Sequence, residues 1–243
     1  MSDGTNATAA SSAPAGTGAG AAPVEVPVLG FTTFTALPTF AVSPIPPPPA
    51  TRRLTHSDGP LVWIDCEMTG LLATDRLLEI AVIITDAQLN PLDEGVSYVI
   101  KTEKHVLDAM GEWCVNQHGI SGLTAACLDP TVARSHQDVR KAVLAYIIDR
   151  VPAKRIGVLA GNTVHADKVF LQRELPELVE HLHYRIVDVS SFKECVRRWY
   201  GEEHVWQGGK GSHRALDDIR GSIEELKHYR QRFFVPPSSV QAS

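Results

Sequence analysis

The sequence has no run of apolar residues close to the roughly 18 that a membrane-spanning helix needs, which excludes a transmembrane protein. Its four cysteines lie far apart and form no CxxC pair. No apolar signal peptide is visible at the start of the chain. We therefore expect free thiols in a reducing, intracellular compartment, cytoplasmic or mitochondrial, with no role for a membrane.

The chain also lacks an excess of positive charge. It has 23 Lys+Arg against 28 Asp+Glu and a formal net charge of -5. Non-specific binding of long nucleic acids depends on a basic surface, which is missing here. Any nucleic-acid substrate is expected to be short or to be gripped locally.

The first 50 residues contain no Lys or Arg, although they hold nine of the 16 prolines and eleven alanines. This composition favours disordered coil that leads into a polyproline spacer at 46–49. We assign residues 1–55 to a disordered Ala/Gly/Pro-rich tail and residues 56–243 to one folded domain. The first basic residues are Arg52 and Arg53, so the tail does not resemble an Arg-rich transit peptide, and the sequence identifies no partner for it.

Strand and helix patterns alternate after residue 60. Apolar, β-branched segments predict strands at 61–64, 77–85, 95–100, 156–160 and 184–187. Helical periodicity predicts helices at 106–118, 121–127, 135–150, 166–174, from the fifth strand through Trp199, and at 213–233. The close spacing of the first strands makes them antiparallel neighbours. The pattern predicts an α/β domain, in which helices cover both faces of a mixed five-stranded sheet.

Two carboxylates lie at the end of the first predicted strand, in the segment Asp65-Cys66-Glu67. Period-two alternation places Asp65 and Glu67 on one face, about 7 Å apart at the backbone, and Cys66 on the other. Two like charges 4 Å apart repel by roughly 4 kcal/mol at an effective dielectric of about 20, so the pair favours a bound cation or a proton. By itself, such a pair more often simply faces solvent at the end of a strand.

Two later acidic segments have local explanations. Asp167 follows the fourth strand, where an acid in the first turn of a helix stabilises the helix dipole. Residues 212–218, Ser-His-Arg-Ala-Leu-Asp-Asp, open the last helix after a glycine-rich stretch, and Ser212 can cap that helix. Neither segment alone indicates a function.

The order of these motifs resembles the DEDDh family of 3′-to-5′ exonucleases, which have a ribonuclease H-like fold. Within it, the segments WIDCEMTGL, AGNTVHADKVFL, HLHYRIVDVSSFKE and SHRALDDI are similar to the oligoribonucleases, especially the eukaryotic ones. The resemblance extends over about residues 61–233. It implies an enzyme that releases 5′ mononucleotides from the 3′ ends of very short single-stranded RNAs, dinucleotides above all.

The resemblance also implies two divalent cations per site, Mg²⁺ or Mn²⁺, which suit hard oxygen ligands and can clamp a scissile phosphate. Their ligands would be Asp65, Glu67, Asp167 and Asp218. His213 would accept the proton of the attacking water, since imidazole titrates near neutral pH. The choice of Asp218 over Asp217 depends on the family's His-x4-Asp spacing, because in a regular helix Asp217 would lie beneath His213.

Substrate contacts follow from the same resemblance. It implies that Leu71 acts as a wedge against the bases, and that Trp113 and His118 line a base pocket. Thr163, Arg185 and Ser190 would close over the 5′ phosphate. Thr163 stands where serine is more usual. Without the resemblance, Leu71 and Trp113 would be interpreted as core residues and Arg185 as a solvated charge.

The family also implies a homodimer, in which the second subunit contributes a tyrosine to the active site. Tyr184 is the matching residue here.

Two alternative functions remain open. One is a DEDDh exonuclease that acts on DNA ends, against which the HYRIVDVS segment argues. The other is a catalytically silent scaffold, which would be expected to lack a metal carboxylate.

Overall fold

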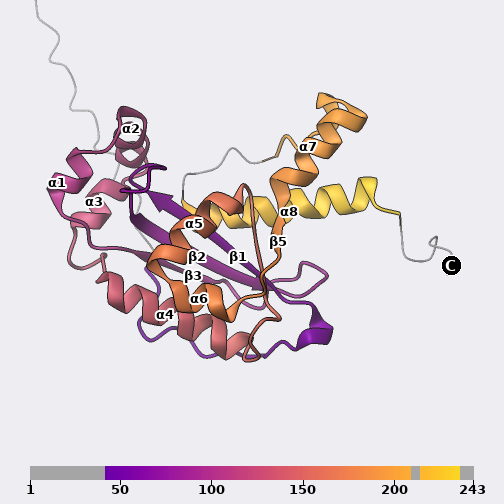
Figure 1. Cartoon of the computed structure of the whole chain (residues 1–243), viewed down its shortest axis with the longest axis horizontal. Coiled ribbons are helices and arrows are strands. Elements are labelled where there is room, and N and C mark those ends of the chain that lie inside the picture. The colour runs from indigo at the N-terminus through magenta and orange to yellow at the C-terminus, as the bar shows by residue number, and fades with distance from the viewer. Residues whose placement is uncertain (1–41, 209–213, 236–243) are drawn as a thin grey trace, which may run out of the picture. The chain divides into compact units, whose positions relative to one another are not determined.

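A five-stranded mixed sheet forms the centre of the computed structural model, which describes residues 42–208 and 214–235 (Figure 1). Its strand order is β3-β2-β1-β4-β5. The antiparallel pairs are β1–β2 and β2–β3, and the parallel pairs are β1–β4 and β4–β5. The strands are β1 (Leu61–Met68), β2 (Leu77–Thr85), β3 (Val96–Val99), β4 (Val158–Gly161) and β5 (Ile186–Asp188). The predicted α/β fold class is confirmed.

Alternation along β1 divides its side chains between two cores. Ile64 and Cys66 pack in one core and Trp63 in the other. The first core lies beneath α4 (His136–Arg150), α5 (Val164–Glu174) and α6 (Pro176–His181). The second lies beneath α7 (Val189–Tyr200) and α8 (Ala215–Phe233). Helices therefore cover both faces of the sheet, as the strand and helix pattern predicts (Figure 1).

Three short helices pack at the β2–β3 side of the sheet. They are α1 (Lys104–Asp108), α2 (Glu112–Ile120) and α3 (Leu123–Leu128). The single helix predicted at 106–118 is wrong, because Gly111 adopts an extended conformation (φ -62°, ψ 153°) and caps α2. The prediction also missed α6, although Pro176 at its first position is a common signal for a helix start.

The residues just before β1 lie along the domain. The Ser43 backbone N–H donates to Ser97 O at 3.1 Å, and the Ala50 N–H donates to Asp149 Oδ2 at 2.7 Å. Leu54 is buried in the first core. Residues 43–54 thus contact the folded domain from within the segment that the sequence assigns to the tail. Residues 1–41 lie outside the described part of the chain, so their disorder stays a prediction.

Two further features complete the framework. Short 3-10 helices occur at His56–Asp58 and Glu202–His204. Gly95, at φ +83°, leads into β3, and a Cβ there would lie only 2.5 Å from Val82 O, so the turn requires glycine. Among the helices of residues 42–208 and 214–235, none is long and apolar enough to cross a membrane.

Candidate active site

Three carboxylates converge where β1 meets the start of α8. Asp65 and Glu67 lie on β1, and Asp218 lies in the first turn of α8. One oxygen from each lies within 4.8 Å of the others, and all three residues are half-buried. The alternation of β1 places its two acids on the face that α8 covers, while Cys66 points into the opposite core.

Asp167 lies beside this group, in the first turn of α5, and is buried. Its Oδ1 accepts the backbone N–H of Cys66 at 3.0 Å. This placement follows from the topology, because α5 begins directly after β4, the parallel neighbour of β1. The structure therefore brings all four predicted carboxylates to the same end of the sheet.

The two consecutive acids of α8 differ in their surroundings. Asp217 is exposed, and its Oδ1 pairs with Arg220 Nη1 at 3.0 Å. Asp218 instead joins Asp65 and Glu67. The structure thus brings to the carboxylate group the residue that the family spacing selects, and not its neighbour.

Burial and mutual repulsion disfavour the charged forms of these groups. The pKa of Glu67 is raised to about 8, mainly by burial and then by repulsion from Glu79, Asp218 and Asp167. Burial, and then repulsion from Asp167, raise the pKa of Asp65 well above its usual value, and burial raises that of Asp167 to about 7. Carboxyl groups of this kind stay protonated near neutral pH unless a cation offsets their charge. A donor set of carboxylate oxygens fits a hard divalent cation.

This electrostatic arrangement predicts pH-dependent stability. A group whose pKa is higher in the folded than in the unfolded state loses its stabilising contribution as the pH rises through the folded pKa. For Glu67 and Asp167 this range extends from their usual values up to about 8 and about 7. In EDTA, the melting temperature should therefore fall between about pH 5 and pH 8, by about 2–4 °C for each kcal/mol lost.

Thermal scans in EDTA and in Mg²⁺ measure this effect. Mg²⁺ should remove most of the fall, because it binds the ionised carboxylates of the folded state. The variant Glu67→Gln should show a smaller fall in EDTA than the unmodified chain. A melting temperature that stays level across this range in EDTA would contradict the prediction.

A fifth acid, Glu79, was not predicted from the sequence. It lies on β2 opposite Glu67, is 1% exposed, and its Oε1 accepts a hydrogen bond from Ser97 Oγ at 2.8 Å. The pKa of Glu79 is raised by burial, although the Ser97 hydroxyl, Arg214 and the Ala215 backbone N–H partly oppose this. The signal was available, since this is a single acid within the otherwise apolar segment LLEIAVIIT.

The residues predicted to contact the bases have very different exposures. Leu71 and Trp113 are 75% and 67% exposed, so their interpretation as core residues is wrong. His118 is 1% exposed, with Nε2 at 2.8 Å from Met68 O and Nδ1 at 3.9 Å from Glu67 Oε2. It therefore fixes α2, the helix that also carries Trp113, against the end of β1. Their roles toward a substrate stay predictions.

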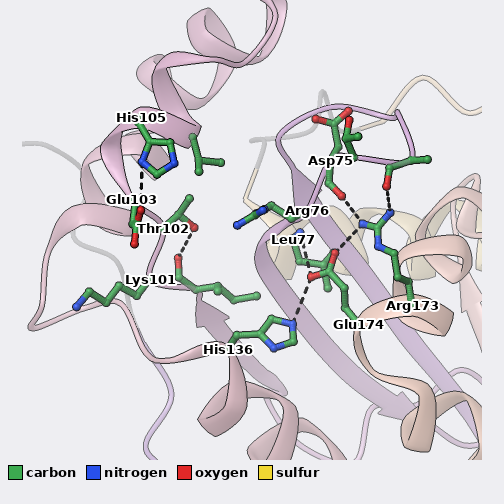
Figure 2. A pocket seen from close by; sticks show the side chains of 14 residues that line it. Asp75, Arg76, Leu77, Lys101, Thr102, Glu103, His105, His136, Arg173 and Glu174 are labelled. Atoms are coloured by element: carbon green, nitrogen blue, oxygen red, sulfur yellow. Dashed lines mark hydrogen bonds and ion pairs between the residues drawn. The ribbon is translucent and has the colours of Figure 1, made fainter.

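Hydrogen bonds that involve Asp75 and Arg173 fix the loop that carries Leu71. The Asp75 carboxylate accepts hydrogen bonds from Thr69 Oγ1 and from the Leu72 N–H, both at 2.7 Å. Arg173 donates to the backbone oxygens of Ala73 and Asp75 (Figure 2). Behind this loop lies a cavity of about 480 Å³. Its lining is largely charge-paired, as in the pairs of Glu174 with Arg173 and His136, so we assign it no ligand.

Two of the three predicted phosphate-binding residues, Thr163 and Ser190, lie together just after β4 and β5, whereas Arg185 precedes β5. Thr163 Oγ1 and Ser190 Oγ lie 2.9 Å apart, and the Thr163 N–H donates to Asp188 Oδ1 at 2.9 Å. Arg185 is exposed, with its guanidinium 5.3 Å from the centroid of the Tyr184 ring. Tyr184 is 65% exposed. His213 lies outside the described residues, so its position is not part of this geometry.

The chain is similar in sequence to known exonucleases. Residues 62–226 match the RNase T family of exonucleases. The chain is 46% identical over 190 residues to a probable oligoribonuclease of Schizosaccharomyces pombe, which covers 78% of this chain and 74% of the relative. It is 49% identical over 185 residues to the oligoribonuclease of Rhodococcus jostii (75% and 92%), and 47% identical over 176 residues to the mitochondrial oligoribonuclease of Mus musculus (72% and 73%).

Solved structures are similar in fold. An exonuclease I from Methylocaldum szegediense has a TM-score of 0.52 at 19% identity, over 72% of this chain and 41% of that one. The metal-free E. coli exonuclease I complex with single-stranded DNA has a TM-score of 0.54 at 15% identity, over 72% and 40%. This chain thus spans about two fifths of the length of those chains, and the likeness confirms the ribonuclease H-like fold. With its family match and its relatives at 46–49% identity, the chain belongs to the oligoribonuclease family of exonucleases.

Proposed function

We propose that this chain is a 3′-to-5′ exoribonuclease that degrades very short oligoribonucleotides, dinucleotides above all, to 5′ mononucleotides by two-metal-ion hydrolysis. The observation that carries this proposal is the convergence of Asp65, Glu67 and Asp218 within 4.8 Å, with Asp167 alongside. Its family is divalent-metal-dependent, and the donor set of this chain fits such ions. Either Mg²⁺ or Mn²⁺ suits oxygen ligands of this type.

The four carboxylates would hold the ions. When bound, two divalent ions activate water and stabilise the leaving 3′ oxygen. The residues of the chain supply the rest. His213 accepts the proton of the attacking water, as a general base near neutral pH. The exposed side chains of Trp113 and Leu71 contact the bases, since apolar and aromatic surfaces hold unpaired bases without sequence preference.

Recognition of the 5′ phosphate explains a preference for short RNA. The hydroxyls of Thr163 and Ser190 lie 2.9 Å apart, and together with Arg185 they would form the site for this phosphate. A site that binds one 5′ phosphate and two bases needs few charge contacts, in agreement with the net charge of -5.

The polarity and metal dependence of the reaction can be tested with a 5′-labelled trinucleotide. We expect a labelled dinucleotide first and a labelled mononucleotide next, with no product in EDTA. Appearance of the labelled mononucleotide before any dinucleotide, or activity that persists in EDTA, would contradict the proposal.

We further propose that the active unit is a homodimer, in which Tyr184 of one subunit completes the site of the other. The 65% exposure of this large aromatic side chain supports an intermolecular role. An inactive Asp167→Asn chain mixed with an inactive Tyr184→Ala chain should then regain activity, up to roughly one quarter of the unmodified level after free subunit exchange. No recovery after exchange has been demonstrated would remove the trans-acting role.

The proposed compartment is intracellular, cytoplasmic or mitochondrial. The relative from Mus musculus is named as mitochondrial, whereas the one from Rhodococcus jostii is bacterial. Short single-stranded RNA is the proposed partner of the site.

A further inference from the structure

A chain of polar contacts runs from inside α8 to the hydroxyl pair at the proposed phosphate site. Glu225, which is 5% exposed, accepts a hydrogen bond at Oε2 from Asn162 Nδ2 at 2.8 Å. Asn162 Oδ1 accepts from Ser190 Oγ at 2.9 Å. Ser190 Oγ in turn lies 2.9 Å from Thr163 Oγ1. The chain begins in the core at Glu225 and ends at the exposed Thr163.

Donor and acceptor chemistry gives this chain a direction. A carboxylate only accepts hydrogen bonds, so the NH₂ group of Asn162 must face Glu225. Ser222 Oγ requires the same orientation, since it donates its own hydrogen to Asp218 O and lies 3.2 Å from Asn162 Nδ2. The Asn162 oxygen therefore faces Ser190.

The Glu225 carboxylate is itself fixed. Tyr229 OH lies 2.8 Å from Oε1, and this hydroxyl accepts the Trp206 N–H at 3.3 Å, so its own hydrogen points to Glu225. Lys193 Nζ lies 3.6 Å from the same carboxylate oxygen. The orientation of Asn162 is thus set from the core.

A serine hydroxyl has one hydrogen, and in Ser190 that hydrogen is given to Asn162. The Ser190 oxygen also accepts the Thr163 N–H at 2.9 Å. In the 2.9 Å contact between the two hydroxyls, the donor must consequently be Thr163. Its hydrogen can turn toward a new acceptor without breaking the contact between Ser190 and Asn162.

We infer that Asn162 is a positioning residue, which Glu225 orients so that it accepts the hydrogen bond from the Ser190 hydroxyl. Thr163 is then the hydroxyl that donates to the 5′ phosphate of the substrate. Phosphate oxygens are strong acceptors, so this site needs a donor that is free to turn. The inference rests on the proposed function. The backbone of Thr163 supports it, because a β-branched residue at φ +54° is uncommon and is held here by Asp188 and Ser190.

The test measures kcat/KM for a 5′-phosphorylated dinucleotide and for the same dinucleotide with a 5′ hydroxyl. The ratio of the two values is the phosphate preference. Thr163→Val should lower this preference about tenfold, the usual scale for a hydrogen bond to a charged group. Ser190→Ala should lower it by at most about threefold. Thr163→Ser should retain it, and Glu224→Gln, an exposed acid next to Glu225, should match the unmodified chain.

A second comparison uses Asn162→Ala, which releases the Ser190 hydrogen. In that background Ser190 becomes a donor, so Thr163→Val should lower the preference by at most about threefold. If melting scans show that Asn162→Ala does not fold, the comparison of Thr163→Val with Ser190→Ala decides alone.

Equal losses from Thr163→Val and Ser190→Ala would overturn the inference, and so would a tenfold loss from Thr163→Val in the Asn162→Ala background. If the unmodified chain still prefers the 5′-phosphorylated dinucleotide, neither result contradicts the proposed function. An unmodified chain with no preference for the 5′ phosphate would instead remove phosphate recognition from the proposed function, and the inference with it.

Discussion

Neutralising one carboxylate of the cluster should lower turnover by on the order of 10³-fold or more, because several kcal/mol of metal-dependent stabilisation are lost. The four substitutions are Asp65→Asn, Glu67→Gln, Asp167→Asn and Asp218→Asn. The fold should persist, since removal of one charge relieves the repulsion that raises the pKa of Glu67. Binding of Mn²⁺, followed by electron paramagnetic resonance, should weaken in the same variants.

The matched control is Asp217→Asn. This residue neighbours Asp218 but pairs with Arg220 at the surface, so its amide variant should keep near-normal turnover and Mn²⁺ binding. An inactive Asp217→Asn together with a fully active Asp218→Asn would show that the wrong acid had been assigned to the cluster.

The substitution His213→Ala should lower kcat by roughly 10²- to 10⁴-fold, the range for loss of a general base. Mn²⁺ binding should stay close to that of the unmodified chain, because the residue has no proposed role as a metal ligand. The dependence of kcat on pH should also lose the limb that an imidazole produces.

The control for this variant is the carboxylate series, in which activity and Mn²⁺ binding fall together. A His213→Ala chain that loses Mn²⁺ binding to the same extent would contradict the separation of proton transfer from metal binding.

Local periodicity predicted much of the sheet and part of the candidate site. The alternation in β1 was sufficient to place Asp65 and Glu67 on one face and Cys66 on the other. The strand predicted at 77–85 has the same bounds as β2. All nine of its residues are buried, so the strand appears in the sequence as one continuous, mostly apolar segment. Both features depend on residues close in sequence.

Features that depend on long-range contacts were not predicted. The composition of residues 43–54 gives no sign of their contacts, because Ser43 pairs with Ser97 and Ala50 with Asp149, far along the chain. Glu79 interrupts an apolar strand, but its place opposite Glu67 depends on the register of two strands. Helical geometry alone likewise left Asp217 and Asp218 open, and the position of α8 against β1 distinguishes them.

The dependence of activity on RNA length distinguishes an enzyme for the shortest RNAs from a general exonuclease. Single-stranded RNAs of two to seven nucleotides, labelled at the 5′ end, would be digested with Mg²⁺ present, and kcat/KM would be determined for each length. We expect the highest value for the dinucleotide and a decline with each added nucleotide. Equal efficiency at all lengths would contradict a preference for the shortest RNAs, although the chain would still be an exonuclease.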